Sequence, residues 1–548
     1  MKTNYTLTNV NSERNKKLRI WGRRILIPVI VASSILIGLL QIQSTPPAEL
    51  NAPDDHFSAE RAMEKLYIIA KEPHPLNSPA HDDVRDYLLS ELQALGLNPE
   101  IQKTDALSDL SGRSGVIENI ITRIPGTDNS KAVMIAAHYD SVPSAQGAAD
   151  DGAGIAAMLE TARAVQASGS LKNDLILLMT DGEEMGLLGA KAFMKEHPWA
   201  QEVGLVLNFE ARGNKGPSFM FETSDENGWL IEQFIKAAPQ PIAYSLIYNV
   251  YKLMPNDTDL TMFREGGMAG LNFAFGMGLD AYHQPLDTPE NLDRSSLQHH
   301  GEYMLSLTKH FGQLDLSQVK QENRVYFNLF GENMVHYPES WAIWLVLLGA
   351  IMFVATLWYG IRLKRINLKG LAGGFLITLL SVGIIYGLIT LLWNLIRSNT
   401  SSSKYSSILL DSHISIYYLF GLLLVTISVA WLLIRWVSRY IRAENIWIGS
   451  LLLWLLLSIG TALYLPGGSY LFIWPLIISL VGLNMSFQLS KGAWIWTSTL
   501  FAVPGFLLFA PICFLVYIMM TLDMAGALMT VVALAFTLIY PVYVRKKE

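Results

Sequence analysis

The chain has 548 residues, a single cysteine, a formal net charge of -6 and a mean hydropathy of +0.29. Charged residues make up 16% of it, against about 25% in soluble globular proteins. This composition excludes a mainly disordered chain, a disulfide scaffold and a cysteine-based zinc site.

The charge is unevenly distributed along the chain. Residues 1–24 carry a net charge of +6, residues 25–340 carry -21 and residues 341–548 carry +9. An acidic central block repels phosphates, so we expect no nucleic-acid partner. The basic, apolar ends instead fit the positive-inside bias of membrane proteins, and we expect the lipid bilayer as a partner.

The first apolar run, residues 25–42, follows five basic residues. It is long enough for a transmembrane anchor, which would leave residues 1–24 in the cytoplasm. A cleaved signal peptide is the alternative, but no small-x-small cleavage motif follows Leu40, so we favour an uncleaved anchor.

Residues 55–320 alternate short apolar runs with helical patterns. This alternation predicts an α/β domain with a mostly parallel mixed sheet and helices on both faces. In such sheets ligands bind beyond the carboxyl ends of the strands. The predicted strands are 132–137, 174–180, 203–209, 218–222 and 269–275, and the predicted helices are 61–71, 84–95, 152–167, 184–196, 227–238 and 295–311.

Metal-capable side chains follow these strands. Each motif alone can be explained by a structural role, such as a helix cap or a solvated first helical turn. Together they predict one cluster of imidazole and carboxylate groups, which suits zinc or a similar divalent ion. His299 and His300, on the last helix, are expected to be surface or packing residues. The motifs are His138-Tyr139-Asp140, Asp150-Asp151-Gly152, Glu183-Glu184, Asn208-x-Glu210 and Tyr282-His283.

The order of these motifs resembles the M28 family of zinc metallopeptidases. Along the chain they read H-Y-D, D-D-G, E-E, N-x-E and Y-H-x-x-x-D-T. The segment Asn256-Asp257-Thr258-Asp259-x-x-x-Phe263 resembles a stretch near the substrate pocket of that family. Together with the membrane spans, the chain resembles the group of the endoplasmic reticulum metallopeptidase and the fungal vacuolar membrane protease.

The resemblance implies a zinc-exopeptidase-like fold and a membrane-bound aminopeptidase that acts on peptides through two Zn²⁺ ions per chain. A zinc-bridged water would attack the peptide carbonyl. Glu183 would be the general base, Asp140 would orient His138, and Tyr282 would donate to the oxyanion. The implied zinc ligands are His138, Asp150, Glu184, Glu210 and His283, with Asp150 bridging the two ions.

Three other functions stay open at this point. The domain could be a catalytically inactive receptor or assembly module, although all five ligand positions and the base are present. It could catalyse another zinc reaction, such as glutaminyl cyclisation or deacylation of N-acyl amino acids. Transport is disfavoured because the predicted C-terminal spans contain no charged residue or histidine.

Residues 321–340 are predicted to be a linker, with a β-segment, before a transmembrane domain at 341–544. With a cytoplasmic N-terminus, 11 of the 13 basic residues in 341–548 fall on the cytoplasmic side. Both termini, including the tail 545–548, would then be cytoplasmic and the peptidase domain extracytoplasmic: periplasmic or exterior in a bacterium, lumenal in a eukaryote. The spans could also contact a membrane-protein partner or a second copy. The seven predicted spans are about 341–361, 371–393, 414–434, 446–464, 469–489, 494–519 and 524–544.

Overall fold

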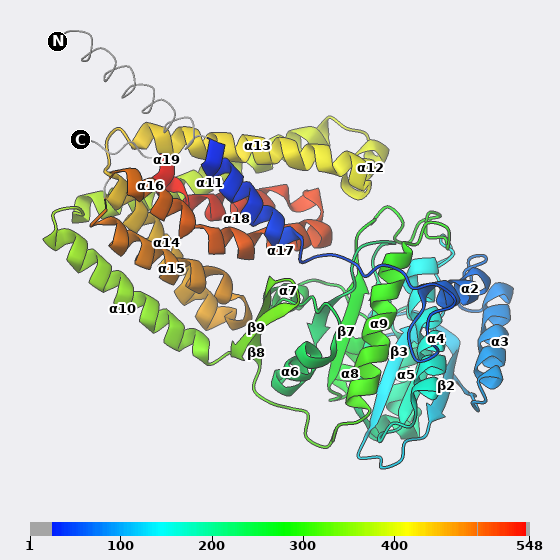
Figure 1. The fold of residues 1–548 in the computed structure, drawn as a ribbon. Coiled ribbons are helices and arrows are strands. Elements are labelled where there is room, and N and C mark those ends of the chain that lie inside the picture. The colour runs from blue at the N-terminus through cyan, green and yellow to red at the C-terminus, as the bar shows by residue number, and fades with distance from the viewer. Residues whose placement is uncertain (1–24, 490, 544–548) are drawn as a thin grey trace, which may run out of the picture.

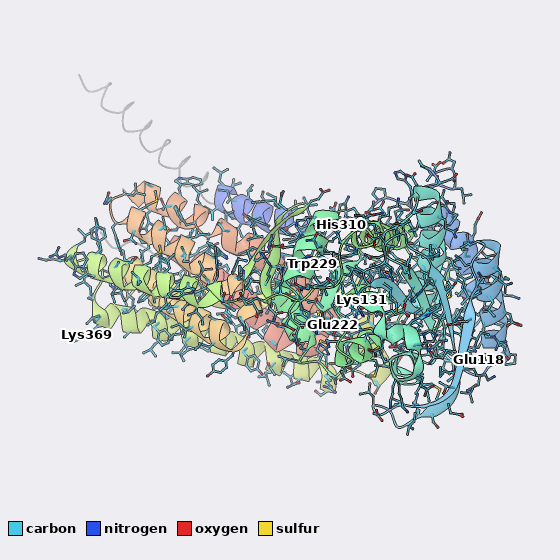
Figure 2. All side chains as sticks on the ribbon, turned by 90° about the horizontal axis from the view of Figure 1, so that it is seen from below. Glu118, Lys131, Glu222, Trp229, His310 and Lys369 are labelled. Atoms are coloured by element: carbon cyan, nitrogen blue, oxygen red, sulfur yellow. The ribbon has the colours of Figure 1, made fainter. Side chains whose placement is uncertain are left out.

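The computed structural model describes residues 25–489 and 491–543, which form an α/β domain joined to a bundle of apolar helices (Figure 1). Figure 2 shows the long axis of the molecule, with Glu118 near the free end of the α/β domain and Lys369 near the opposite end of the bundle. The predicted fold class is confirmed. The predicted cytoplasmic segments 1–24 and 545–548 lie outside the described residues.

A seven-stranded mixed sheet forms the centre of the α/β domain, in the order β1-β2-β4-β3-β5-β7-β6. The four inner strands β4, β3, β5 and β7 are parallel, and the other three are antiparallel to their neighbours. The parallel strands are apolar runs because both faces of the sheet are covered. The strands are β1 (Glu100–Leu107), β2 (Ser114–Ile124), β3 (Ala132–His138), β4 (Leu175–Thr180), β5 (Val203–Ala211), β6 (Phe219–Thr223) and β7 (Gly270–Phe275).

Helices cover both faces of this sheet, and alternate residues of β3 face opposite layers. Val133 and Ile135 belong to the core beneath α2, α4 and α9, whereas Met134 packs in the core that holds Phe193 of α5 and Phe263 of α8. This alternation follows from the two-residue period of a strand. The helices are α2 (Ala59–Ile69), α3 (Pro79–Ala94), α4 (Ala153–Ser168), α5 (Leu188–Glu196), α6 (Gly228–Ala237), α7 (Ser245–Tyr251), α8 (Asp259–Glu265) and α9 (Arg294–Phe311).

The sequence interpretation missed four elements and misplaced the starts of two helices, of which the helix predicted at 84–95 begins at Pro79. Strands β1 and β2 and the short helices α7 and α8 were not predicted. Strand β1 lies at the edge of the sheet and has no fully buried residue, so it lacks the apolar run that marked the inner strands. The helix predicted at 184–196 begins at Leu188, because Gly182 and Gly186 adopt positive φ angles of 67° and 115° in the turn before it.

Residues 324–338 form a hairpin that packs the α/β domain onto the helical bundle. Its strands are β8 (Arg324–Phe330) and β9 (Asn333–Pro338). The ring of Phe327 stacks on Tyr470 of the bundle with ring centroids 4.3 Å apart. Nearby, the Ser245 hydroxyl donates a hydrogen bond to the Gly467 carbonyl at 2.6 Å. The two parts of the chain are thus in direct contact through buried side chains.

In the described part of the bundle, five helical stretches are long and apolar enough to cross a membrane, at 341–362, 368–398, 412–437, 443–464 and 493–520, the last counted across a break at 501–502. The other three predicted spans fall on shorter apolar helices, Ile25–Leu39, Tyr470–Ser486 and Leu522–Thr537, so eight crossings stay a prediction. The helices are α10 (Trp341–Arg362), α11 (Leu368–Ser398), α12 (Ser402–Leu410), α13 (Ser412–Val437), α14 (Ala443–Tyr464), α15 (Tyr470–Ser486), α16 (Lys491–Leu500), α17 (Val503–Met520), α18 (Ala525–Thr537) and α19 (Tyr540–Tyr543).

Two of the predicted spans are interrupted, and each contains a proline at the break. The span at 494–519 divides into α16 and α17, and Pro504 lies in the first turn of α17. The span at 524–544 divides into α18 and α19, and α19 contains Pro541. Proline lacks a backbone N–H, so Pro504 and Pro541 cannot donate to the carbonyls of Leu500 and Thr537, the residues at which α16 and α18 end.

His299 and His300 of α9 are buried in the α/β core, so the expectation of packing residues holds and that of surface residues is wrong. The ring of His300 lies edge-on to Phe209 and Phe275, with centroids 4.8 and 5.2 Å away. Its Nδ1 lies 2.8 Å from the Ser218 hydroxyl oxygen. Burial lowers the pKa of His300 to about 3, and that of His299 to about 4.

Replacing His300 with Asn is expected to make the protein less sensitive to acid. An unfolded imidazole has a pKa of about 6.5, so between pH 6.5 and the lowered folded value only the unfolded state binds the proton. Stability is therefore lost as the pH falls below 6.5, by about 2 kcal/mol per such histidine at pH 5, and is unaffected above 6.5. Thermal unfolding in detergent at pH 7 and pH 5, at equal zinc loading, measures this loss. An equal loss in the variant would contradict it.

Candidate metal centre

The side chains predicted to bind metal meet at one edge of the sheet. His138 ends β3, Glu184 follows β4, Glu210 lies near the end of β5, and His283 lies in the loop after β7. Asp150 comes from the loop that leads into α4, where the Asp150–Asp151 peptide bond is cis. Because the carboxyl ends of parallel strands share one sheet edge, residues far apart in the sequence converge there.

The first group of donor atoms surrounds Nε2 of His138. This nitrogen lies 3.3 Å from Oδ1 of Asp150 and 3.7 Å from Oε2 of Glu210. Nδ1, the other ring nitrogen, lies 2.9 Å from the backbone carbonyl of Asp140. An N–H at Nδ1 can donate to that carbonyl and leave Nε2 free as a ligand.

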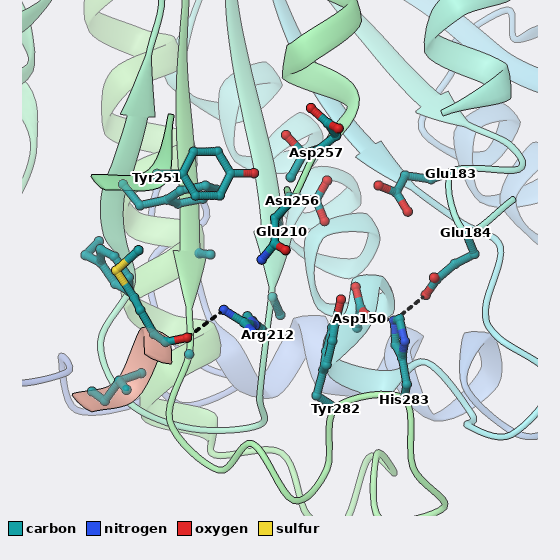
Figure 3. A pocket seen from close by; sticks show the side chains of 18 residues that line it. Asp150, Glu183, Glu184, Glu210, Arg212, Tyr251, Asn256, Asp257, Tyr282 and His283 are labelled. Carbon is teal, nitrogen blue, oxygen red and sulfur yellow. Dashed lines mark hydrogen bonds and ion pairs between the residues drawn. The ribbon is translucent and has the colours of Figure 1, made fainter. Parts of the chain in front are cut away.

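The second group surrounds Nε2 of His283, which lies 3.1 Å from Oδ2 of Asp150 and 3.1 Å from Oε1 of Glu184 (Figure 3). Asp150 thus directs one carboxylate oxygen to each group. This is the arrangement that a carboxylate bridging two cations requires.

The donor atoms fit zinc in type and spacing. In a tetrahedral site with metal–ligand bonds of about 2.0–2.2 Å, neighbouring donor atoms lie about 3.4 Å apart. The four separations in the two groups, from 3.1 to 3.7 Å, lie on both sides of that value. Each group also offers three protein ligands, as catalytic zinc sites do when they keep a position open for water or substrate.

The electrostatics of the cluster also favour a bound cation. Burial, and then the charge of neighbouring carboxylates, raises the pKa of Glu184 and Glu210. Burial opposes protonation of His283, but its hydrogen bonds to Asp150 and Glu184 raise its pKa to about 10. Dications among these groups would keep the carboxylates ionised and the imidazoles neutral, because a nearby positive charge favours both forms.

Asp151 is a rival ligand that the sequence interpretation did not consider. Donor atoms of His138, Asp151 and Glu210 lie within 4.8 Å of one another, as do those of His138, Asp150 and Glu184. The carboxylate of Asp151, however, accepts hydrogen bonds from the backbone N–H groups of His138 and Gly154, at 3.3 and 3.1 Å. We therefore propose that Asp151 stabilises the start of α4 rather than binding metal.

Asp140 does more than the sequence interpretation assigned to it. Its carboxylate lies 3.4 Å from Nδ1 of His138, farther than the backbone carbonyl of the same residue. The same carboxylate accepts hydrogen bonds from the backbone N–H groups of Glu183 and Glu184, at 3.0 and 3.2 Å. Asp140 therefore fixes the turn that presents the Glu183–Glu184 pair.

Asp287 likewise supports the loop that carries Asp150. Its carboxylate accepts hydrogen bonds from the backbone N–H groups of Ala149 and Asp150, at 2.7 and 3.4 Å. It belongs to the Y-H-x-x-x-D-T motif, but the sequence interpretation gave it no role. A buried carboxylate behind a ligand loop can be recognised only from the structure.

A cavity of about 260 Å³ opens beside the two donor groups (Figure 3). Glu183 extends into it from the same turn as Glu184, and Tyr282 rises next to His283 with ring centroids 3.9 Å apart. Asn256 and Asp257 line the cavity too, as the resemblance of their segment implies.

Two further residues of the cavity were missed by the sequence interpretation. The side chain of Tyr251 reaches across the cavity, and its hydroxyl has no hydrogen-bond partner among the described residues (Figure 3). Arg212, two residues beyond Glu210, donates a hydrogen bond from Nη1 to the backbone carbonyl of Met519 at 3.0 Å. Neither residue stands in a recognisable motif.

Sequence comparison finds relatives of the domain that carries this site. The model of Peptidase family M28 matches residues 119–308. The vacuolar membrane protease of Yarrowia lipolytica (strain CLIB 122 / E 150) is 30% identical over 394 residues, which are 65% of this chain and 39% of that protein. Endoplasmic reticulum metallopeptidase 1 of Homo sapiens is 27% identical over 57% of this chain and 38% of that protein. The chain therefore spans less than half the length of these relatives.

Solved structures similar to this chain include a Zn-dependent exopeptidase from Parabacteroides distasonis ATCC 8503, at a TM-score of 0.38 and 20% identity. It covers 47% of this chain and 98% of its own. The glutaminyl cyclase of Porphyromonas gingivalis also has a TM-score of 0.38, at 18% identity, with 46% of this chain and 97% of its own covered. Scores this low do not distinguish between the two activities.

Proposed function

We propose, from the premise that residues 119–308 form a Peptidase family M28 domain homologous to the vacuolar membrane protease and endoplasmic reticulum metallopeptidase 1, that this chain is a membrane-bound di-zinc aminopeptidase. One observation supports this most directly. Asp150 directs one oxygen to each of two three-ligand groups, and Glu183 extends into the same cavity.

Different residues of the cavity have different roles in peptide hydrolysis. When bound, zinc ions would supply Lewis acidity and lower the pKa of a coordinated water molecule. Glu183 accepts the proton of the attacking water and then delivers it to the leaving amine, so the peptide C–N bond breaks with no net change in protons. The Tyr282 hydroxyl donates a hydrogen bond to the carbonyl oxygen as that oxygen gains negative charge.

The shape and charge of the cavity favour the end of a peptide as substrate. Its volume of about 260 Å³ is below the roughly 300–1,000 Å³ of pockets that hold drug-sized ligands. Asp257 lines it and belongs to neither donor group. One oxygen of its carboxylate accepts a hydrogen bond from the Thr261 hydroxyl at 3.1 Å, which leaves the other oxygen to pair with the α-ammonium group of a peptide. An internal segment of a protein would offer no such charge.

The apolar helices integrate the chain into a membrane. The distribution of basic residues supports cytoplasmic termini and an extracytoplasmic peptidase domain. In this arrangement the substrates are peptides of the periplasm, cell exterior or lumen, and they reach the cavity next to the membrane surface.

The full chain, purified in detergent, is expected to hydrolyse an L-leucyl arylamide and to leave the N-acetylated form of the same compound intact. Acetylation removes the α-ammonium group that the acidic cavity would bind. A chelator should abolish hydrolysis and added zinc should restore it, with two zinc ions per chain by elemental analysis. Arylamine release measured by absorbance, with and without chelator, provides the readout.

Other outcomes of this assay point to other functions. Equal arylamine release from the acetylated compound would contradict an aminopeptidase, whereas release of acetate from it without release of arylamine would favour a deacylase. Ring closure of an N-terminal glutamine without peptide hydrolysis, with one zinc ion per chain, would indicate a cyclase. A chain that binds no zinc would be a receptor or assembly module.

A further inference from the structure

The cavity beside the metal ligands has an apolar wall, and the membrane bundle forms part of it. Phe219 and Phe221 of β6 and Ala274 of β7 line the wall from the sheet. Ile518 and Met519, in the last turn of α17, line it from the bundle. Each of the five is at most 8% exposed. Residues separated by about 300 positions thus form one continuous apolar surface.

The end of α17 is attached to the sheet that carries the ligands. Arg212 holds the backbone carbonyl of Met519 at 3.0 Å, and Arg212 follows the proposed ligand Glu210 by two residues (Figure 3). At the end of β7, a Cβ atom on Gly276 would lie 3.5 Å from Cγ2 of Ile518, an ordinary van der Waals contact. The bundle side of the wall is therefore in direct contact with the sheet that carries the metal ligands.

We propose that this wall binds the side chain of the substrate's N-terminal residue, and that Ile518 and Met519 select peptides that begin with an apolar residue such as Leu, Met or Phe. The proposal rests on the proposed function, because it assigns the substrate class of the same site. An apolar side chain loses contact with water at this wall, whereas a charged one would be buried without a partner. The bundle is then part of the substrate-binding site as well as an anchor.

Two opposite substitutions at Ile518 test the wall in the full-length, zinc-loaded protein. Ile518→Ala enlarges the cavity and should raise kcat/KM for Phe-arylamide relative to Leu-arylamide. Ile518→Phe fills it and should shift the preference toward Ala-arylamide. Each ratio should change about 10-fold or more, because one methylene group in an apolar pocket changes specificity by about 10- to 200-fold. Simple loss of folded protein would lower the measured activity on all three arylamides by the same factor and leave the kcat/KM ratios unchanged.

Ile512→Ala provides a matched control. Ile512 lies in the same helix, is 1% exposed and does not line the cavity. The substitution removes the same atoms from the packing of α17, so it should leave the substrate ratios at their wild-type values. Equal shifts in Ile512→Ala and Ile518→Ala would overturn a direct contact between the wall and the substrate.

Binding of free L-leucine and of glycine, measured by calorimetry with and without zinc, separates this proposal from the proposed function. Leucine should bind at least about 10-fold more tightly than glycine, and Ile518→Ala should narrow the difference. If no arylamide is cleaved but leucine still binds more tightly than glycine in a way that depends on Ile518, the proposed function is contradicted and the proposed role of the apolar wall is supported. If arylamides are cleaved but neither the kcat/KM ratios nor leucine binding depend on Ile518, the proposed role of the apolar wall is overturned and the proposed function is supported. If both readouts are negative, both proposals are overturned.

Discussion

The variant Glu183→Gln is expected to lose at least about 100-fold in kcat and to keep the zinc content of the wild type. General acid–base groups contribute roughly 100- to 10,000-fold to the rate, and an amide of the same shape can neither accept nor deliver the proton. Glu183 lines the cavity but has no place in either donor group, so its neutralisation should leave the ligands intact. Arylamide turnover and zinc per chain, measured on the same preparation, test both parts.

Glu196→Gln serves as the control, because Glu196 is an exposed residue at the end of α5 and undergoes the same chemical change. It should behave as the wild type in both measurements. Turnover of Glu183→Gln at the wild-type rate would remove Glu183 from the mechanism. Loss of zinc with loss of turnover would make Glu183 a ligand and leave the base unassigned.

The second large effect is expected at Asp150. Replacing it with Asn removes one negative charge from both donor groups and puts an amide nitrogen, which is no ligand, in place of one of the two oxygens. Outer partners of metal ligands alone change affinity about 10- to 100-fold, so a ligand shared by two ions should change zinc affinity by more than about 100-fold. Zinc retained after dialysis against a weak chelator, together with arylamide turnover, measures the loss.

Asp151→Asn is the paired variant, since it makes the same change one residue later. Asp151 accepts backbone hydrogen bonds from His138 and Gly154, so its loss should lower thermal stability and leave two zinc ions in place. The reverse result, with zinc lost in Asp151→Asn and kept in Asp150→Asn, would make Asp151 the ligand beside His138 and Glu210.

The inner sheet and the convergence of the candidate ligands were predictable because the physics that fixes them is local. A parallel strand buried on both faces is a continuous apolar run, and the polar residue that follows it lies at the ligand edge. His138 and Glu210 were found in this way. Strand β1 was missed because this edge strand is exposed on one face and only half-buried on the other, so it has no such run. Helix α8, which has seven residues, is too short to show a helical period.

Other parts of the site depend on contacts that leave no signal in the sequence. Arg212 donates a hydrogen bond to Met519, which lies 307 positions later in the sequence. No sequence pattern near either residue predicts this contact. The hold of Asp140 on the Glu183–Glu184 turn is likewise visible only once the loops after β3 and β4 lie side by side. Sequence motifs identify the chemistry of a metal site, whereas the walls of its cavity come from the packing of distant segments.

The attachment of α17 to the sheet connects bilayer thickness to substrate choice. A transmembrane helix adjusts its tilt to the thickness of the surrounding hydrocarbon layer. Ile518 and Met519 lie at the end of such a helix, whereas the proposed metal ligands all lie in the sheet domain. We therefore expect a thinner or thicker bilayer to act on the bundle side of the cavity, and so on which peptides fit, while the groups proposed to carry out hydrolysis keep their places.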